Sequence, residues 1–414
     1  MDFWIGVLLF ALGIGVTIAL HEAGHMMAAR ACGMRVRRYF IGFGPTVWST
    51  TRGHTEYGLK AIPLGGFCDI AGMTVNDPWT EEEEPYLMID RPAWQRLFVM
   101  FAGILVNLIL GVLIIFSVAI SFGLPSTAEQ KLEPVAAELV CSPVSLEDAE
   151  NATEENPNCS GEGAAAASGV QVGDRFTMVD GQDIVEFPDV IAAVQSAGAD
   201  AADAGTEVGG TTTVPATVER DGRSVDLDLQ VAVVEREDGP TGAIGVSVRV
   251  PEQEMVDYNP VTAIGGTADF TWFIGKETVN ALLDLPERYW PVVQSIFGGE
   301  RQMDSPVSVV GASHAGGQLV EQEQWMSFLL LLANLNFFLA VFNMVPLPPL
   351  DGGHAIVVVW EKIRDWIRRK RGLEPGGPVD YVKLMPLTYV ATAILLVFGV
   401  TVIVADVVNP LRLF

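Results

Sequence analysis

Three side chains near the N-terminus have the types and the spacing of a hydrolytic metal centre. His21 and His25 stand four residues apart in "ALHEAGHMMAAR", so on an α-helix they lie on nearly the same face, about 6 Å apart along the axis. Glu22 projects to one side of this pair, from where it can reach a metal-activated water without taking a metal position. Such a carboxylate acts as the general base of a zinc hydrolase. The simpler interpretation is that the three residues mark the water-exposed end of a helix.

The helix that must carry these residues is apolar enough to lie in a membrane. The run from Phe3 to Leu20 approaches the roughly 20 helical residues that cross a bilayer. Asp2 stands where a signal peptide has basic residues, so we expect a retained membrane helix. Ionisable groups at the centre of a membrane helix cost about 2.5 to 3.5 kcal/mol each, which favours a functional role for them. Three further spans are predicted at 97–122, 328–350 and 384–404.

The chain has 414 residues and a net charge of −26, and this charge is confined to one segment. Between Gly123 and Met326 there are 35 acidic and 9 basic side chains, whereas the remainder has 16 of each. We therefore expect the central segment to be exposed to water. This charge argues against nucleic acid or anionic lipid as a partner of the segment, because their phosphates would be repelled.

The basic residues beside the predicted spans indicate how the chain crosses the membrane. They all fall on one side, which the positive-inside rule assigns to the cytoplasm. Both termini and the central segment are then expected outside, and His21 near the cytoplasmic side. The basic residues are Arg30, Arg35, Arg37, Arg38, Arg91, Arg96, Lys362, Arg364, Arg368, Arg369, Lys370, Arg371 and Lys383.

The cysteines agree with this orientation. Cys32 and Cys68 fall on the cytoplasmic side, where thiols stay reduced, and Cys141 and Cys159 fall outside. We predict a disulfide between Cys141 and Cys159 that closes part of the acidic insert at 123–163. The alternative is a pair of free thiols.

Residues 164–250 change to short β-like runs. Two tight turns are predicted, at Asp180-Gly181 and at Asp221-Gly222. The stretch "SGVQVGDRFTMVDGQ" resembles a PDZ domain of the bacterial protease-associated kind. That resemblance implies either capture of extended peptide ends or, if the groove is narrow, a steric filter.

Residues 251–326 have amphipathic stretches that suit either the membrane surface or packing against the PDZ-like domain. Within them, 305–317 is expected to form a structured loop.

A third metal ligand is expected, because a catalytic zinc has three protein ligands and one open position. The stretch "NMVPLPPLDGGH" supplies Asp351 near the cytoplasmic end of the third span. Its prolines and glycines cannot continue a regular helix, which is tolerated at membrane depth where protein or a water-filled cavity surrounds the backbone. His354 is the rival ligand, and His54 and His314 are poorer candidates.

Together these motifs resemble the site-2 protease family of intramembrane zinc metalloproteases, in particular the bacterial members that release membrane-anchored anti-sigma factors. The resemblance implies one Zn²⁺ held by His21, His25 and Asp351, with Glu22 as the general base. Residues 37–73 alternate enough to predict a β-hairpin with a turn near Arg52-Gly53, and the resemblance implies that this hairpin is membrane-associated and can pair with an extended substrate. Five residues are implied to contact the substrate or to pack on the catalytic helices. They are Asn343 of "NMVPLPPLDGGH", Gly103 and Asn107 of "FAGILVN", and Gly65 and Gly66 of "GGFC". Cys68 and the acidic insert depart from the common family pattern.

The expected fold is an α-helical membrane protein with two membrane helices in 1–122, two in 327–414, and an inserted α+β PDZ-like domain. The expected activity is intramembrane cleavage of single-pass proteins in a bacterial cell membrane, such as anti-sigma factors, after another extracytoplasmic protease has trimmed them. The alternative is a non-catalytic membrane PDZ receptor, a scaffold or a transporter with a structural metal site. A structural zinc would have four protein ligands, and a transporter would show repeated halves.

Overall fold

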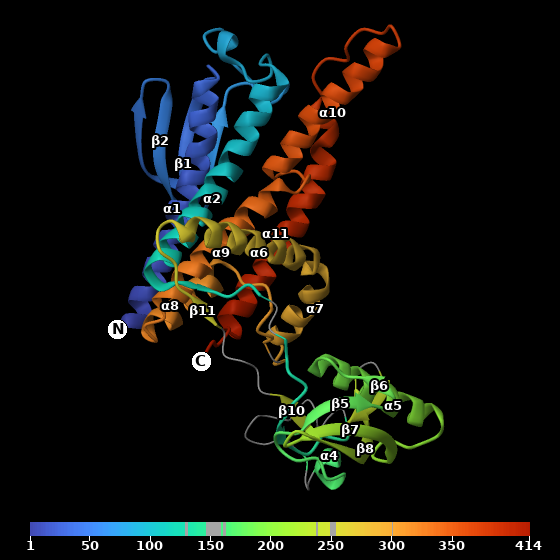
Figure 1. Ribbon diagram of the computed structural model, residues 1–414. Coiled ribbons are helices and arrows are strands. Elements are labelled where there is room, and N and C mark those ends of the chain that lie inside the picture. The colour runs from blue at the N-terminus through green and yellow to red at the C-terminus, as the bar shows by residue number, and fades with distance from the viewer. Residues whose placement is uncertain (129–130, 146–158, 160–162, 237–238, 249–253, 300) are drawn as a thin grey trace. The chain divides into compact units, whose positions relative to one another are not determined.

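The computed structural model describes the chain except residues 129–130, 146–158, 160–162, 237–238, 249–253 and 300 (Figure 1). The described residues form two compact units. Unit 1 comprises Met1–Thr127 and Met255–Phe414, and unit 2 comprises Ala128–Glu254. Of the predicted acidic insert at 123–163, residues 129–130, 146–158 and 160–162 lie outside the described residues.

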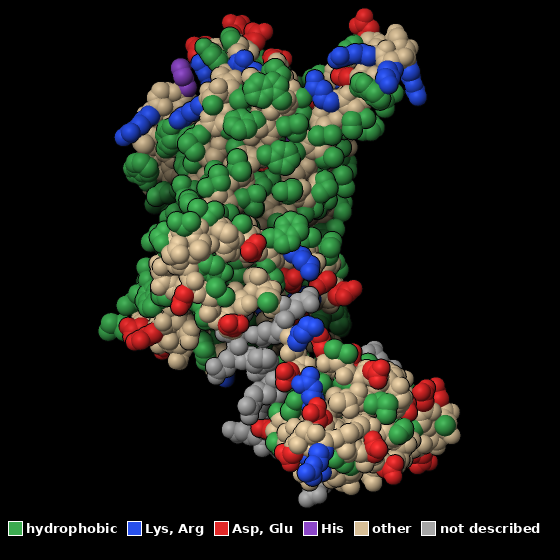
Figure 2. Space-filling model, viewed as in Figure 1, with side chains coloured by type: hydrophobic (Ala, Val, Ile, Leu, Met, Phe, Trp, Pro, Cys, Tyr) green, Lys and Arg blue, Asp and Glu red, His purple; other side chains and the backbone are tan. Residues whose placement is uncertain are grey.

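Four helices of unit 1 are long and apolar enough to cross a membrane, among the residues that the structure describes. Apolar helices are thereby confirmed at the four predicted spans, although the third ends at Met344 and not near residue 350. In Figure 2 the middle of unit 1 is largely apolar, and Lys, Arg, Asp and Glu gather towards its two ends. The four helices are α1 (Asp2–Ala31), α2 (Ala93–Phe122), α9 (Trp325–Met344) and α11 (Met385–Val408), the last of which follows the 3₁₀ turn η2 (Tyr381–Leu384).

The expected loop at 305–317 is largely a helix, α8 (Val309–Glu321), so that prediction is wrong. Its small residues let α8 lie directly against α1, since a Cβ on Gly316 would come within 2.7 Å of Phe10 Cβ. The Ser308 side chain caps the helix by accepting hydrogen bonds from two backbone N–H groups. Glycines disfavour an isolated helix, but here close packing outweighs their low helix propensity.

Two amphipathic helices, α6 (Thr262–Leu283) and α7 (Leu285–Ile296), follow the short pairing of β3 (Leu124–Pro125) with β11 (Met255–Val256). Helix α6 packs Phe270 in one apolar cluster with residues of α2 and α9, and α7 packs Val292 against α11. Trp272 and Trp290 remain largely exposed. These helices are therefore packed on the membrane helices of their own unit.

The third span is broken where the sequence predicted it. Helix α9 ends at Met344, and α10 (Asp351–Lys370) begins after six irregular residues. A Cβ on Gly352 would meet the carbonyl oxygens of Met344 and Val345, and one on Gly353 would lie 2.5 Å from Pro348 N. Only glycine therefore lets the irregular segment fold back over the first turn of α10, which fixes Asp351 at the start of the helix.

The predicted β-hairpin is present as β1 (Val36–Arg52) and β2 (Thr55–Ile70), but its pairing is more elaborate. Phe40 lies opposite both Phe67 and Gly58, so residues 36–41 run between residues 66–70 and residues 56–59. Residues 48–52 pair with the outer side of 55–59. The hairpin is thus folded into four rows beside α1. One further short element, η1 (Glu84–Tyr86), precedes α2.

Unit 2 contains a five-stranded antiparallel sheet in the order β6-β5-β7-β8-β9, packed on α5 around an apolar core. Both predicted tight turns are present, with positive φ at Asp180 and Gly181 and at Asp221 and Gly222. The elements are β4 (Ala136–Leu139), α4 (Ala164–Ala167), β5 (Arg175–Val179), β6 (Gln182–Asp183), α5 (Phe187–Asp203), β7 (Thr211–Arg220), β8 (Arg223–Arg236), β9 (Gly239–Ala243) and β10 (Val246–Val248), the last paired with β4.

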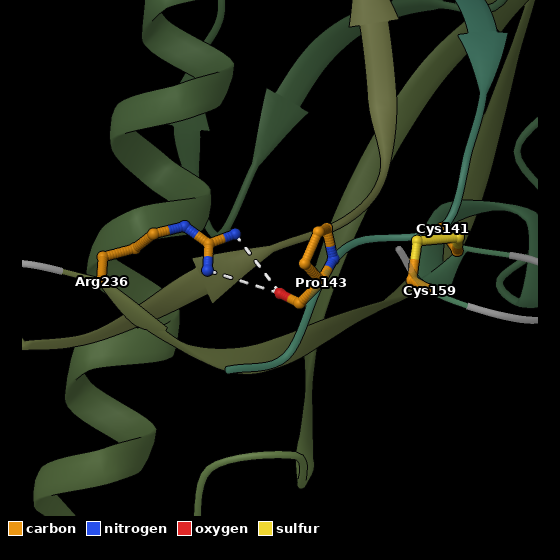
Figure 3. Close-up of a disulfide and its surroundings, with 4 residues drawn as sticks. All are labelled: Cys141, Pro143, Cys159 and Arg236. Atoms are coloured by element: carbon orange, nitrogen blue, oxygen red, sulfur yellow. Dashed lines mark hydrogen bonds between the residues drawn. A yellow bond between two sulfur atoms is a disulfide. The ribbon is translucent and has the colours of Figure 1, made fainter. Parts of the chain in front are cut away.

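The predicted disulfide between Cys141 and Cys159 is confirmed (Figure 3). Next to it, both terminal guanidinium nitrogens of Arg236 donate hydrogen bonds to the Pro143 carbonyl oxygen, each at 3.4 Å. The segment after β4 is thereby fixed to the end of β8. Cys32 and Cys68 are free.

Candidate metal centre

The two histidines of α1 point their Nε2 atoms at one position. These atoms lie 3.2 Å apart, and both residues are buried. His25 Nδ1 lies 2.8 Å from the Val99 carbonyl oxygen of α2. Since a carbonyl only accepts, His25 must donate from Nδ1, which leaves the lone pair on Nε2. This second hydrogen bond orients the ring as in metal-bound histidines.

Asp351 brings a third oxygen to the same position from α10. Its Oδ2 lies 3.3 Å from Nε2 of His21 and 3.3 Å from Nε2 of His25. Despite these distances, Oδ2 has no partner in hydrogen-bond geometry among the described residues. Donor atoms from residues 330 positions apart in the chain therefore converge on one position.

The donor set fits a zinc ion. Zinc bonds nitrogen and carboxylate oxygen at about 2.0–2.2 Å, so two donors of a tetrahedral site lie roughly 3.3–3.5 Å apart. The three observed separations, 3.2, 3.3 and 3.3 Å, are close to that value. Among the residues that the structure describes, this is the one group of three His, Cys, Asp or Glu side chains with ligand atoms within 4.8 Å of one another. Three protein donors leave one position open, as in catalytic zinc sites.

Glu22 lies beside the donor set and is not part of it. A Cβ on Gly66 would come within 2.9 Å of Glu22 Cγ and 3.3 Å of Ile18, so this part of β2 lies against α1. Tyr39 ties the sheet to α1 as well, because its hydroxyl donates a 2.7 Å hydrogen bond to the Ala19 carbonyl oxygen. The base candidate thus stands between the metal position and the folded hairpin.

Gly103 lies directly against the two imidazoles. A Cβ at this position would be 2.8 Å from His21 Nε2 and closer still to His25 Nε2. Its neighbour on the same helix face, Asn107, is 1 % exposed, and neither atom of its amide has a partner among the described residues. The glycine is therefore required by the metal position itself, and Asn107 offers an unpaired amide one turn away.

The remaining predicted residues, Asn343 and Gly65, have contacts of another kind. Asn343 donates a 3.0 Å hydrogen bond to the Leu339 carbonyl oxygen of its own helix. Gly65 has φ +116°, and a Cβ there would meet the Phe43 ring at 2.5 Å, so its role is to let the strand pass that ring.

The three rival histidines do not join the site, among the described residues. His354 Nδ1 lies 3.4 Å from the Tyr381 hydroxyl, and the two rings stack. His54 lies at the β1–β2 turn, and His314 of α8 bonds to Gln318. Asp351, unlike these rivals, is brought to the two imidazoles by the tertiary structure.

A buried ion pair that the sequence did not reveal connects two helices of the site. Arg96 Nη1 of α2 donates a 2.7 Å hydrogen bond to Glu361 Oε2 of α10, and both side chains are less than 10 % exposed. Glu361 Oε1 accepts a second hydrogen bond from Val379 N at 2.7 Å. The pair links the helix of Gly103 to the helix of Asp351. The one sequence signal for it was a carboxylate at the start of a strongly basic stretch.

Comparison with known proteins is consistent with this geometry. Residues 9–387 match Peptidase family M50. Over 425 aligned residues that cover both chains completely, the protein is 43 % identical to zinc metalloprotease Rip1 of Mycolicibacterium smegmatis and 39 % identical to that of Mycobacterium tuberculosis H37Rv. It is 26 % identical to metalloprotease MmpA of Caulobacter vibrioides, over 86 % of each chain.

Proposed function

Because the chain belongs to Peptidase family M50, the site-2 protease family of zinc metalloproteases, we propose that His21, His25 and Asp351 hold its zinc and that Glu22 is the general base. Membership of this family sets aside the non-catalytic receptor, scaffold and transporter, and it implies intramembrane proteolysis. The observation that carries the residue assignment is the convergence of the three donor atoms at 3.2–3.3 Å, with no hydrogen-bond partner for Asp351 Oδ2 among the described residues.

The chemistry is the hydrolysis of a peptide bond in the substrate. Zinc at this site supplies Lewis-acid activation of water and of the scissile carbonyl group. Glu22 takes a proton from the water molecule while the water oxygen bonds to the carbonyl carbon. As the C–N bond breaks, Glu22 gives that proton to the leaving amine. The unpaired Asn107 amide lies one turn from Gly103 and is available to hold a polar atom of the substrate backbone.

The substrate must be extended, because a helical peptide hides its amides in its own hydrogen bonds. Residues 66–70 pair on one side only within the described sheet, with residues 36–41. Gly66 belongs to this outer row and lies against Glu22. A substrate strand that joins the row is therefore delivered to the general base. The exposed side chains of Phe43, Val47 and Trp48 favour contact of the hairpin with the membrane.

Residues outside the metal site support the proposal that a substrate is trimmed before it is cut in the membrane. We assign unit 2 a PDZ-like fold. We place it outside the cytoplasm, together with both termini, because the basic residues beside the spans lie on the opposite side. The close packing of α5 on β9 favours a size filter over capture of peptide ends: a Cβ on Gly198 would overlap the backbone of Gly242. This close approach disfavours the addition of a peptide strand between α5 and β9. Single-pass substrates, such as anti-sigma factors, would then be cut only after an extracytoplasmic protease has trimmed them.

Glu22→Gln and Asp351→Asn test the residue assignment in the full chain reconstituted with a single-pass substrate. Glu22→Gln keeps all three donors, so we expect full zinc content by elemental analysis and cleavage reduced by about 10²–10⁴. Asp351→Asn weakens a donor, so zinc content itself should fall. Undiminished cleavage by the first variant removes Glu22 from its role. Unchanged zinc content and cleavage in the second would assign the third ligand elsewhere.

Labelling of introduced cysteines in intact cells tests the orientation separately. Cysteines at exposed positions of unit 2 should react with a membrane-impermeant reagent. Cysteines beside the basic cluster at 368–371 should react only after the cells are opened. The reverse pattern would overturn the topology and leave the metal site unaffected.

A further inference from the structure

A pocket of about 500 Å³ lies at the end of α1, away from the metal centre. The last turn of α1, the first residues of β1, the β1–β2 turn and Tyr86 form its walls. Arg30, Arg35 and Arg52 line it, together with His54, Thr55 and Tyr57, and we call it the Arg30 pocket. No carboxylate is among its lining residues.

The three arginines carry charge that the protein does not neutralise. Within the described part of the chain, none of them forms an ion pair, although Arg37 and Arg38 a few residues away do. Strand alternation directs Glu56 to the face of β2 opposite to Thr55 and Tyr57. The pocket is therefore a concentration of positive charge in contact with solvent.

Neutral groups hold two of the arginines in place. Arg30 Nη2 donates hydrogen bonds to the hydroxyls of Thr55, at 2.9 Å, and Tyr57. Thr55 is 3 % exposed, and its hydroxyl donates to the Val36 carbonyl oxygen at 2.6 Å. The Arg35 guanidinium lies 5.0 Å from the centre of the Tyr86 ring. The guanidinium groups are thus positioned while their charge remains available to a ligand, and guanidinium groups are suited to phosphate.

The position of the pocket indicates where that phosphate comes from. Helix α1 has 30 residues and is about 45 Å long, which exceeds a hydrocarbon layer of about 30 Å. Trp94, at the start of α2, is 65 % exposed, and such residues mark the membrane interface. Figure 2 shows Lys and Arg, together with Asp and Glu, gathered at this end of unit 1, beyond its apolar middle. The end of α1, and the pocket on it, therefore lie at the level of the lipid headgroups.

We propose that the Arg30 pocket binds the phosphate of an anionic phospholipid headgroup. The bound phosphate bridges Arg30 of α1 to Arg52 at the β1–β2 turn. It thereby holds the folded hairpin against the helix that carries His21 and His25. All residues that line the pocket belong to unit 1.

Native mass spectrometry of the detergent-purified full chain tests the proposal. The protein is titrated with dihexanoyl phosphatidylglycerol or with dihexanoyl phosphatidylcholine. We expect a bound phosphatidylglycerol whose affinity falls at least tenfold in Arg30→Gln/Arg35→Gln/Arg52→Gln. The matched control, Lys362→Gln/Arg369→Gln/Arg371→Gln, removes the same charge from exposed positions on and just after α10 and should stay within twofold of wild type.

Each result decides the matter. Equal binding by wild type and the pocket variant, or an equal loss in the control variant, overturns the proposal, because basic surface charge alone then explains the binding. Glycerol 3-phosphate forms the second arm of the titration. If it binds as tightly as the lipid and with the same dependence on the pocket, the site takes a soluble phosphate and the lipid assignment is wrong. Arg52→Gln alone, at an exposed turn, keeps the test valid if the triple variant misfolds, and should weaken the lipid at least threefold.

Discussion

Gly103→Ala offers the sharpest test of how the helices form the metal position. The added Cβ would lie 2.8 Å from His21 Nε2, whereas carbon and nitrogen atoms in contact normally lie about 3.5 Å apart. The overlap with His21 is therefore about 0.7 Å, and that with His25 is larger. Either the imidazoles turn away or α2 moves outward, and both changes spread the three donors.

The expected loss follows from that displacement. Disturbing the groups that orient metal ligands typically lowers metal affinity about 10–100-fold, which corresponds to about 1.4–2.7 kcal/mol. A misplacement of about 1 Å costs roughly 10²-fold in rate even when the metal is present. We therefore expect Gly103→Ala to bind zinc at least tenfold more weakly in a competition titration against a chelator, and to cleave about 100-fold more slowly in saturating zinc.

Gly111→Ala is the matched control for helix packing. This glycine lies two turns further along α2, and a Cβ there would meet the Phe337 ring at 2.7 Å, away from the donors. Overpacking costs about 1–3 kcal/mol in either variant, so both should unfold at lower temperature. Only Gly103→Ala should lose zinc. If Gly103→Ala binds zinc as tightly as wild type, the donors do not lie where we place them.

Two further predictions concern ion pairs outside the metal position. Arg96→Met leaves Glu361 buried without its partner and should destabilise unit 1 by about 3–5 kcal/mol. The double variant Arg96→Met/Glu361→Leu should recover most of that loss in thermal unfolding. Equal stability of the single variant and wild type would contradict this. In unit 2, burial favours a raised pKa of Asp174, but the bidentate hydrogen bonds from Arg220 and one from Gln171 N outweigh it and hold the pKa below the usual value. Ionised Asp174 therefore stabilises folded unit 2 above about pH 4, and this stabilisation is lost as the pH falls through its lower folded-state pKa. The urea midpoint of isolated unit 2 should drop below pH 4 in wild type and stay flatter in Asp174→Asn.

Local features of the fold could be predicted from the sequence. The apolar runs predicted four membrane helices, because the length and polarity of a span are set by the bilayer. The prolines after Met344 predicted the break before α10, and the Asp-Gly pairs predicted two turns with positive φ. In each case the determining interaction lies within a few residues of the chain.

Packing reversed one such prediction and refined another. The stretch 305–317 has many glycines, which suggested a loop, yet Gly316 and Gly317 allow α8 to pack on α1. The hairpin turn at Gly53 was predicted, but the pairing of Phe40 with both Phe67 and Gly58 was not. That second pairing needs contacts between residues that are far apart along the strands.

The sequence by itself determined that His21 and His25 share a helix face with Glu22 at their side, since a helix fixes the spacing of residues four apart. The sequence put Asp351 forward beside its rival His354, but only the tertiary structure brings Asp351 to within 3.3 Å of both imidazoles, because no local rule relates it to a helix that begins some 350 residues earlier. The tertiary structure also decided that Gly103 leaves room for the imidazoles and that Arg96 and Glu361 connect α2 to α10. Those relations depend on how close whole helices approach, and that distance is set by the packing of every side chain between them.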